Sequence, residues 1–168
     1  MIKKNNDGFT LIELLIVVAI IAILAVIVFV ALDPLRRFQD SRDSVRWQEV
    51  SELANAIKVY QVDNGGYYPD AVSNMATDSV YMIVDGNYTS YCDDYNSSCD
   101  TSVSGDSYCV NLHDLIVSST IGAIPISPTG KKQWTESRTG YTLVRDAYGA
   151  IHVRACESEN STEIEVVR

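Results

Sequence analysis

An unbroken apolar run near the N-terminus constrains this chain more than any other feature. Residues 14–32 are nineteen consecutive apolar positions. At about 1.5 Å per helical residue the run would span roughly 28 Å, close to the hydrocarbon thickness of a bilayer, about 30 Å. It therefore predicts one membrane-spanning helix. The rest of the 168-residue chain is long enough for one small domain.

The run differs from a cleavable secretory signal. Lys3 and Lys4 precede it, as basic residues precede a signal peptide. The apolar region of a secretory signal, however, is about 7–15 residues long and is followed by a cleavage site of small residues. Here the run is longer and ends in Leu32-Asp33-Pro34. We expect it to be kept in the mature protein.

The cysteines indicate which side of the membrane the domain occupies. Basic residues flank both ends of the run, so charge alone does not fix the orientation. An even number of cysteines after the run suits disulfides in an oxidising compartment, which places the domain outside the cytoplasm. A zinc site is disfavoured because the chain has no C-x2-C pair. The disulfide candidates are Cys92, Cys99, Cys109 and Cys156.

Four cysteines allow three pairings, and the sequence does not choose among them. The pairing we expect is Cys92 with Cys99 and Cys109 with Cys156. The first bond would close an acidic loop, and the second would tie the last strand to the middle of the domain. Both would support a core too small to be stable by itself.

The charge distribution argues against nucleic acid as a direct partner. The net charge is −9, and residues 59–130 contain nine aspartates and no lysine or arginine. Such a surface repels phosphates. The cluster of Asp93, Asp94, Asp100 and Asp106 could offer oxygen ligands to calcium, but it lacks the D-x-[DN]-x-[DN]-G loop. We expect a solvated acidic loop and no metal site.

Catalysis is not indicated either. His113 and His152 have no persuasive nucleophile beside them in the sequence, and there is no phosphate loop or paired-carboxylate arrangement. We therefore expect no catalytic residues, no cofactor and no enzyme activity.

One carboxylate, Glu13, stands at the start of the apolar segment. A charge inside a bilayer costs a few kcal/mol near its centre, so Glu13 needs a partner or a shallow position. The hexapeptide Gly8-Phe9-Thr10-Leu11-Ile12-Glu13, followed by a membrane-length apolar run, resembles the processing site of type IV prepilins and pseudopilins. This resemblance implies that a membrane peptidase cuts after Gly8 and methylates the new N-terminal Phe9.

The resemblance also implies that Glu13 pairs with the Phe9 amine of a neighbouring subunit. A free α-amine has a pKa of about 7.7–8.0, and a nearby carboxylate in apolar surroundings favours its charged form. Each group then offsets the desolvation of the other. Phe9 and Glu13 are four residues apart, so a pair within one chain is the alternative.

The helix is expected to continue beyond the apolar run. Pro34 should kink it near Asp33, and residues 63–66, Asp-Asn-Gly-Gly, should end it. This end and the following Tyr67-Tyr68-Pro69 also resemble the end of the long helix in pilins and pseudopilins. Polar side chains occupy the positions between the apolar ones, namely Arg46, Glu49, Glu52 and Lys58. Apolar residues recur every three or four positions as an amphipathic stripe: Val45, Trp47, Val50, Leu53, Ala54, Ile57 and Tyr60.

The remaining sequence predicts a small antiparallel sheet packed on that helix, an α+β fold typical of pilin heads. We expect a hairpin of residues 80–84 and 88–92, a short helix at 110–118, and strands at 141–145 and 150–156. The predicted organisation is a leader at 1–8, a transmembrane and filament-core helix at 9–33, an amphipathic helix at 34–64 and a globular head at 65–168.

The resemblance implies a structural subunit of a type IV pilus-like filament used in adhesion, motility or DNA uptake. A pseudopilin of a type II secretion-like system is the alternative, and a membrane-anchored binding domain fits less well. The partners would be further copies or related pilins, the prepilin peptidase, the membrane, and an inner-membrane assembly machinery with its ATPase. The precursor would cross the cytoplasmic (inner) membrane once with its head outside, and would then enter an extracytoplasmic or cell-surface filament.

Overall fold

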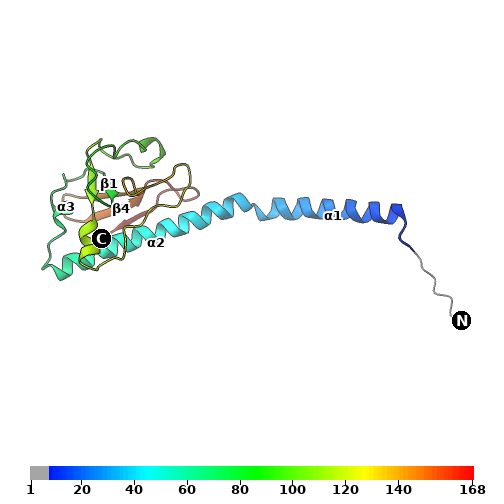
Figure 1. Ribbon diagram of the computed structural model, residues 1–168, viewed down its shortest axis with the longest axis horizontal. Coiled ribbons are helices and arrows are strands. Elements are labelled where there is room, and N and C mark those ends of the chain that lie inside the picture. Colours follow the sequence, from blue (N-terminus) through cyan, green and yellow to red (C-terminus); the bar gives the residue numbers. More distant parts are fainter. Residues whose placement is uncertain (1–7) are drawn as a thin grey trace. The chain divides into compact units, whose positions relative to one another are not determined.

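The computed structural model describes residues 8–168 (Figure 1). Most of the expected leader, including Lys3 and Lys4, lies outside the described residues. The chain divides into two compact units, with the boundary between Phe38 and Gln39.

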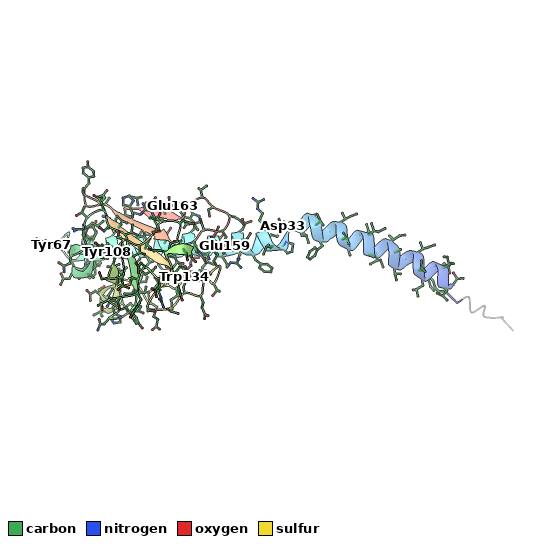
Figure 2. All side chains as sticks on the ribbon, turned by 90° about the horizontal axis from the view of Figure 1, so that it is seen from above. Asp33, Tyr67, Tyr108, Trp134, Glu159 and Glu163 are labelled. Carbon is green, nitrogen blue, oxygen red and sulfur yellow. A yellow bond between two sulfur atoms is a disulfide. The ribbon has the colours of Figure 1, made fainter. Side chains whose placement is uncertain are left out.

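Helix α1 (Leu11–Leu32) contains the apolar run. Among the described residues, the helical stretch Leu11–Asp63 is the one that is long and apolar enough to cross a membrane, by length and composition. All residues of α1 lie in the described part of the chain, and none of them is buried. Apolar side chains project all around the helix (Figure 2). A helix that is apolar on every side requires apolar surroundings, which lipid or other helices can supply.

The predicted interruption at Asp33 is confirmed. Asp33 adopts left-handed backbone angles, φ 37° and ψ 67°, and α2 (Pro34–Asp63) begins at the next residue. Proline suits the first position of a helix because its missing N–H would have no partner within the helix there. The Arg37 Nε donates to the Leu32 carbonyl at 2.9 Å and so satisfies one of the last acceptors of α1.

Helix α2 ends where the Asp-Asn-Gly-Gly segment predicted. Gly65 and Gly66 have positive φ angles of 69° and 96°. The Gly66 N–H donates to the Gln61 carbonyl at 2.7 Å. Glycine closes the helix because only a residue without Cβ adopts these angles freely.

The second unit is an α+β domain, as predicted. Its sheet contains β1 (Tyr81–Val84), β2 (Cys109–Asn111), β3 (Tyr141–Arg145), β4 (Ile151–Ala155) and β5 (Glu165–Val167), in the order β2-β1-β3-β4-β5. The short helices α3 (Asp70–Ser73), η1 (Asn96–Ser98) and α4 (His113–Val117) connect them.

Apolar clusters lie on both faces of the sheet. The main core joins α2 to one face, where Leu53 and Ile57 share a fully buried cluster with Ile83, Leu143 and Val153. The next side chains along β1, Met82 and Val84, point to the opposite face, because side chains alternate along a strand. There they form a smaller cluster that includes Val103, Trp134, Cys92 and Cys156.

Several predicted elements need correction. The sheet is mixed, because β1 pairs with β2 in parallel and with β3 in antiparallel orientation. The predicted hairpin is wrong, since residues 88–92 form a loop and contain no strand. The predicted helix 110–118 is shorter, because residues 109–111 supply an edge strand and the buried Val110 packs into the core. Strand 141–145 is confirmed, and the second strand runs from 151 to 155.

Candidate assembly site and the ionic clamp of the head

The expected cleavage point lies in an exposed segment that precedes the first helix. Residues 8–10 precede the helix, and α1 begins at Leu11. The Phe9 side chain is 87% exposed, and a Cβ placed on Gly8 would meet no atom within 4 Å. The Gly8–Phe9 peptide bond is therefore not shielded by the rest of the described chain, and its backbone is not locked in a helix.

Glu13 caps the helix that contains it. Thr10 is the N-cap, with φ −80° and ψ 153°. The Thr10 backbone N–H and hydroxyl both donate to Glu13 Oε2, at 2.8 and 2.7 Å, and the Glu13 N–H donates to the Thr10 hydroxyl at 3.3 Å. This reciprocal arrangement is a capping box, which stabilises the first turn of a helix.

The cap supplies the Glu13 carboxylate with hydrogen-bond partners inside its own chain. Both bonds from Thr10 reach the same carboxylate oxygen, and Thr10 keeps its N–H and hydroxyl after a cut behind Gly8. The geometry places Thr10, Glu13 and the Phe9 backbone at one end of α1. The sequence signal for this cap is Thr followed three residues later by Glu, the capping-box pattern, which lies within the processing motif.

The beginning of α2 in the second unit is held by a buried ionic clamp, formed by Arg42, Asp43, Arg46, Glu157 and Glu159. Arg46 is fully buried. Its Nη1 donates to Asp43 Oδ1 and Glu159 Oε1, both at 2.8 Å, and its Nη2 to Glu157 Oε1 at 2.7 Å. Its remaining bonds go to the Pro128 carbonyl and the Ser127 hydroxyl. Arg42 pairs with Glu159.

Asp43 completes the clamp from the other side. Its carboxylate accepts the backbone N–H groups of Glu159, Asn160 and Ser161 at 2.8–3.2 Å. Burial raises the pKa of Asp43, but these backbone bonds and the Arg46 guanidinium outweigh burial and lower it. The Arg42 guanidinium lowers the pKa of Glu159, and Arg46 adds to this effect. The clamp thus fastens residues 157–161 to α2 through ionised side chains.

The position of Arg46 contradicts its assignment to the polar face of the helix. The middle of the predicted apolar stripe is correct, since Val50, Leu53, Ala54 and Ile57 are buried. Glu49 is also partly enclosed, and its carboxylate accepts a hydrogen bond from the Tyr141 hydroxyl. Burial raises the pKa of both Glu49 and Tyr141. Helical periodicity did not predict these contacts of Arg46 and Glu49, because their partners lie far along the chain.

All four cysteines form disulfides, but the expected pairing is wrong. Cys92 bonds to Cys109, and Cys99 bonds to Cys156. Cys109 begins β2 and Cys156 follows β4, so each bond ties the loop after β1 to the end of a strand. The expected pairing failed because it assumed a local loop closure, whereas the loop contributes to the small cluster that packs on the second face of β1.

Three carboxylates of the acidic loop lie close together, but two of them are engaged by other groups of the chain. Oxygen atoms of Asp93, Asp94 and Asp106 lie within 4.8 Å of one another. Asp94 is paired with Arg138 at 2.6 Å, and Asp106 accepts the Tyr91 N–H at 2.7 Å. Asp100, the fourth residue of the predicted acidic loop, accepts instead from Ser158.

The two histidines are in separate places. His113 Nδ1 lies 3.1 Å from Asp85, and His152 Nδ1 lies 2.7 Å from Glu165. His113 begins α4 and His152 lies in β4, so the two histidines stand beside different carboxylates in different elements.

Comparison with known proteins identifies the N-terminal segment. Residues 3–29 match the model of the prokaryotic N-terminal methylation motif. Searches of curated proteins and of solved structures found no match. The matched residues include Gly8, Phe9, Glu13 and most of α1. The chain therefore carries the processing motif of type IV prepilins and pseudopilins.

Proposed function

We propose that this chain is a structural, non-enzymatic subunit of a type IV pilus-like filament, cut after Gly8, N-methylated at Phe9 and assembled through α1. The observation that carries the proposal is that three features occur together at the N-terminal end of the chain. The methylation motif covers residues 3–29, the Gly8–Phe9 segment is exposed and not helical, and it leads into a helix whose apolar side chains are not buried within the described chain.

Assembly would bury the surface that α1 exposes. In the membrane this surface contacts lipid, and in a filament the α1 helices of many copies replace the lipid with one another. Apolar burial contributes about 25 cal/mol per Å² relative to water. The head would stay outside this helical core. An inner-membrane machinery with its ATPase would supply the work of extraction.

Glu13 would have two roles. In one chain its carboxylate caps α1 through Thr10. In the filament it would also pair with the Phe9 amine of a neighbour, a group that is released by cleavage. Two opposite charges in apolar surroundings offset each other's desolvation, and the pair would fix the register between subunits.

Charge and capping can be separated at this position. In Glu13→Gln the side chain keeps a carbonyl oxygen, and glutamine serves in capping boxes as glutamate does, but the charge is gone. We expect Glu13→Gln and Glu13→Leu to be cut after Gly8 at the normal rate and to yield few or no filaments. Thr10→Ala, which removes the capping hydroxyl and keeps Glu13, should still assemble. Processing is read by intact mass, and assembly by electron microscopy of sheared material.

The outcome for Glu13→Gln decides the intermolecular role. Normal filaments from Glu13→Gln together with a defect in Thr10→Ala would reduce Glu13 to a helix cap. Failure of cleavage in these variants would instead assign Glu13 to recognition by the peptidase.

Secretion pseudopilins share the methylation motif, and a pseudopilin of a type II secretion-like system is the second candidate. The pilus is preferred because the head displays exposed tyrosines on loops tied by two disulfides, as suits a surface in contact with the medium. Neighbouring genes for a retraction motor would support the pilus, and genes for a secretin with its secretion components would support the alternative.

A further inference from the structure

We propose that a hollow in the head binds a neutral, hydroxyl-rich saccharide unit. The hollow has a volume of about 410 Å³ and is lined by residues 87–91 and 94 of the loop after β1 and by residues 137–138 of the loop before β3. This volume lies within the range of small-molecule sites. The inference concerns the head alone and does not depend on filament assembly.

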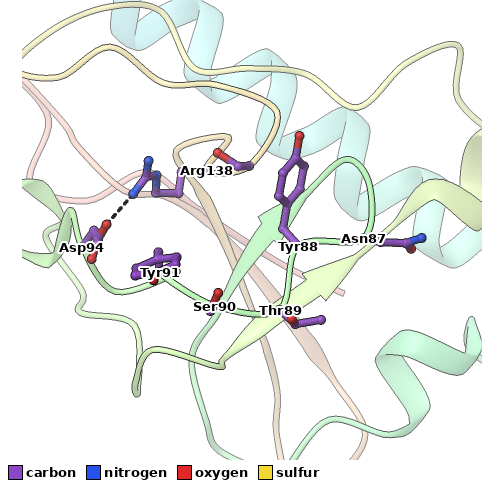
Figure 3. A pocket seen from close by; sticks show the side chains of 8 residues that line it. Asn87, Tyr88, Thr89, Ser90, Tyr91, Asp94 and Arg138 are labelled. Atoms are coloured by element: carbon purple, nitrogen blue, oxygen red, sulfur yellow. Dashed lines mark hydrogen bonds and ion pairs between the residues drawn. The ribbon is translucent and has the colours of Figure 1, made fainter.

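Two tyrosines supply the aromatic surfaces. Tyr88 and Tyr91 project from the same loop, while Arg138 approaches from the other loop and is joined to Asp94 (Figure 3). Tyr88 is 41% exposed and Tyr91 64% exposed. Their rings are thus accessible beside the hollow and are not part of the core.

The backbone at Tyr91 is strained. Its φ of 64° lies in the left-handed region, which a bulky residue seldom adopts. The conformation is held because the Tyr91 N–H donates to Asp106 Oδ1 at 2.7 Å, and because the next residue, Cys92, is bonded to Cys109. Strain of this kind concentrates at binding and catalytic sites, where the surrounding structure maintains it.

The Tyr88 ring is also held in place by packing. Gly86 has φ 120°, and a Cβ there would lie 3.2 Å from Tyr88 Cε2, so the ring packs closely against the glycine. The Asp85 N–H donates to the Glu136 carbonyl at 2.9 Å, which joins the two loops at the edge of the hollow. The site is therefore built before any ligand arrives, which lowers the entropic cost of binding.

The polar groups favour a neutral ligand. Arg138 Nη1 donates to Asp94 Oδ2 at 2.6 Å, and its guanidinium lies 4.5 Å from the centre of the Tyr95 ring. The Arg138 charge is thus already compensated. The carboxylates of Asp93 and Asp106 lie within 4.8 Å of that of Asp94, so the rim carries an excess of negative charge that repels anions.

A sugar ring fits this combination of groups. Its C–H face is apolar and stacks on an aromatic ring, while its hydroxyls both donate and accept hydrogen bonds. Tyrosine offers a large rigid contact area with little loss of conformational entropy. Asp94 can accept from sugar hydroxyls, while the Ser137 hydroxyl can both donate and accept. The accessible rings suit a terminal saccharide unit.

The test uses the full chain in a detergent without a sugar headgroup, with EDTA present to keep metals off the acidic loop. The probe is an array of neutral oligosaccharides of hexoses and N-acetylhexosamines, printed beside their sialylated and sulfated counterparts. We expect the chain to bind neutral members in preference to the acidic ones. Dissociation constants for the best neutral member are then measured in solution.

The decisive variant is Tyr91→Gly, because glycine adopts the positive φ without strain and only the ring is lost. Tyr91→Gly and Tyr88→Ala should each weaken binding by about tenfold or more. Tyr148→Ala is the matched control, since Tyr148 is 98% exposed at the turn between β3 and β4 and lies outside the hollow. It should bind as the unmodified chain does.

Three results would overturn the proposal: no binding to any neutral glycan, equal binding by Tyr91→Gly and the unmodified chain, or preference for the sialylated or sulfated glycans. Near-ultraviolet circular dichroism shows whether each variant keeps the native fold, so that a loss of binding is assigned to the missing ring.

Discussion

Arg46 is a charged side chain held entirely inside the head. It is completely buried, and five hydrogen bonds from its guanidinium go to Asp43, Glu157, Glu159, Pro128 and Ser127. Helical periodicity predicted a solvent-facing residue here. The prediction failed because periodicity registers only neighbours within α2, whereas Glu157 and Glu159 are 111 and 113 residues further along the chain.

Arg46→Met should strongly destabilise the head. Removing one partner of a buried ion pair costs about 3–5 kcal/mol, because the remaining charges are left without compensation. Arg168→Met, at an exposed position, is the control and should have little effect. The midpoint of thermal unfolding, followed by near-ultraviolet circular dichroism, measures both. An unchanged midpoint for Arg46→Met would show that the clamp does not support the fold.

The clamp also predicts acid sensitivity. The pKa values of Asp43 and Glu159 are lower in the folded chain than their ordinary values of 3.8 and 4.5. Groups with a lowered folded pKa stabilise the fold above their unfolded pKa, and this contribution is lost as the pH falls through the folded value. We therefore expect stability to decrease as the pH drops below about 4.5.

A variant separates the clamp from general acid effects. Glu159→Gln removes one of the two carboxylates whose pKa is lowered, so its stability should vary less with pH below about 4.5 than that of the unmodified chain. Glu52→Gln serves as the comparison at an exposed position of α2. Parallel stability curves for Glu159→Gln and the unmodified chain would contradict the account.

At the scale of helices and strands, features set by neighbouring residues could be predicted from the sequence, and features set by residues far along the chain could not. Pro34 and the Asp-Asn-Gly-Gly segment act on the backbone beside them, so the break at Asp33 and the end of α2 followed from sequence. Two strand-forming runs on either side of a turn at residues 146–149 likewise located β3 and β4. The partner of β1 could not be predicted in this way, because β2 joins it in parallel after a loop that covers the sheet.

The disulfide pairing is directly testable, because cleavage before aspartate separates the four cysteines. Without reduction, the peptide of residues 85–92 should remain linked to that of residues 106–113 through Cys92 and Cys109. The peptide of residues 94–99 should be linked to the one that begins at Asp146 and contains Cys156. Mass spectrometry before and after reduction identifies both pairs. A link between peptides 85–92 and 94–99 would restore the pairing expected from sequence.

At the scale of the whole molecule, the chain combines two surfaces with different requirements. Helix α1 exposes apolar side chains on all sides, and the second unit is an acidic α+β domain tied by two disulfides. The sequence predicted the first surface almost completely, because nineteen consecutive apolar residues and the processing motif are local features. The hollow of the head was not predicted, since its two loops meet only through tertiary contacts.

The most direct test of the central claim is the N-terminus of the native protein. Intact mass and N-terminal sequencing should be carried out on the chain recovered from its own host, separately from membranes and from material sheared off the cell surface. A pilus subunit should begin at N-methylated Phe9 in the sheared fraction, whereas the same start found only in membranes would favour the secretion pseudopilin. An intact Met1 in a host with an active prepilin peptidase would contradict the account.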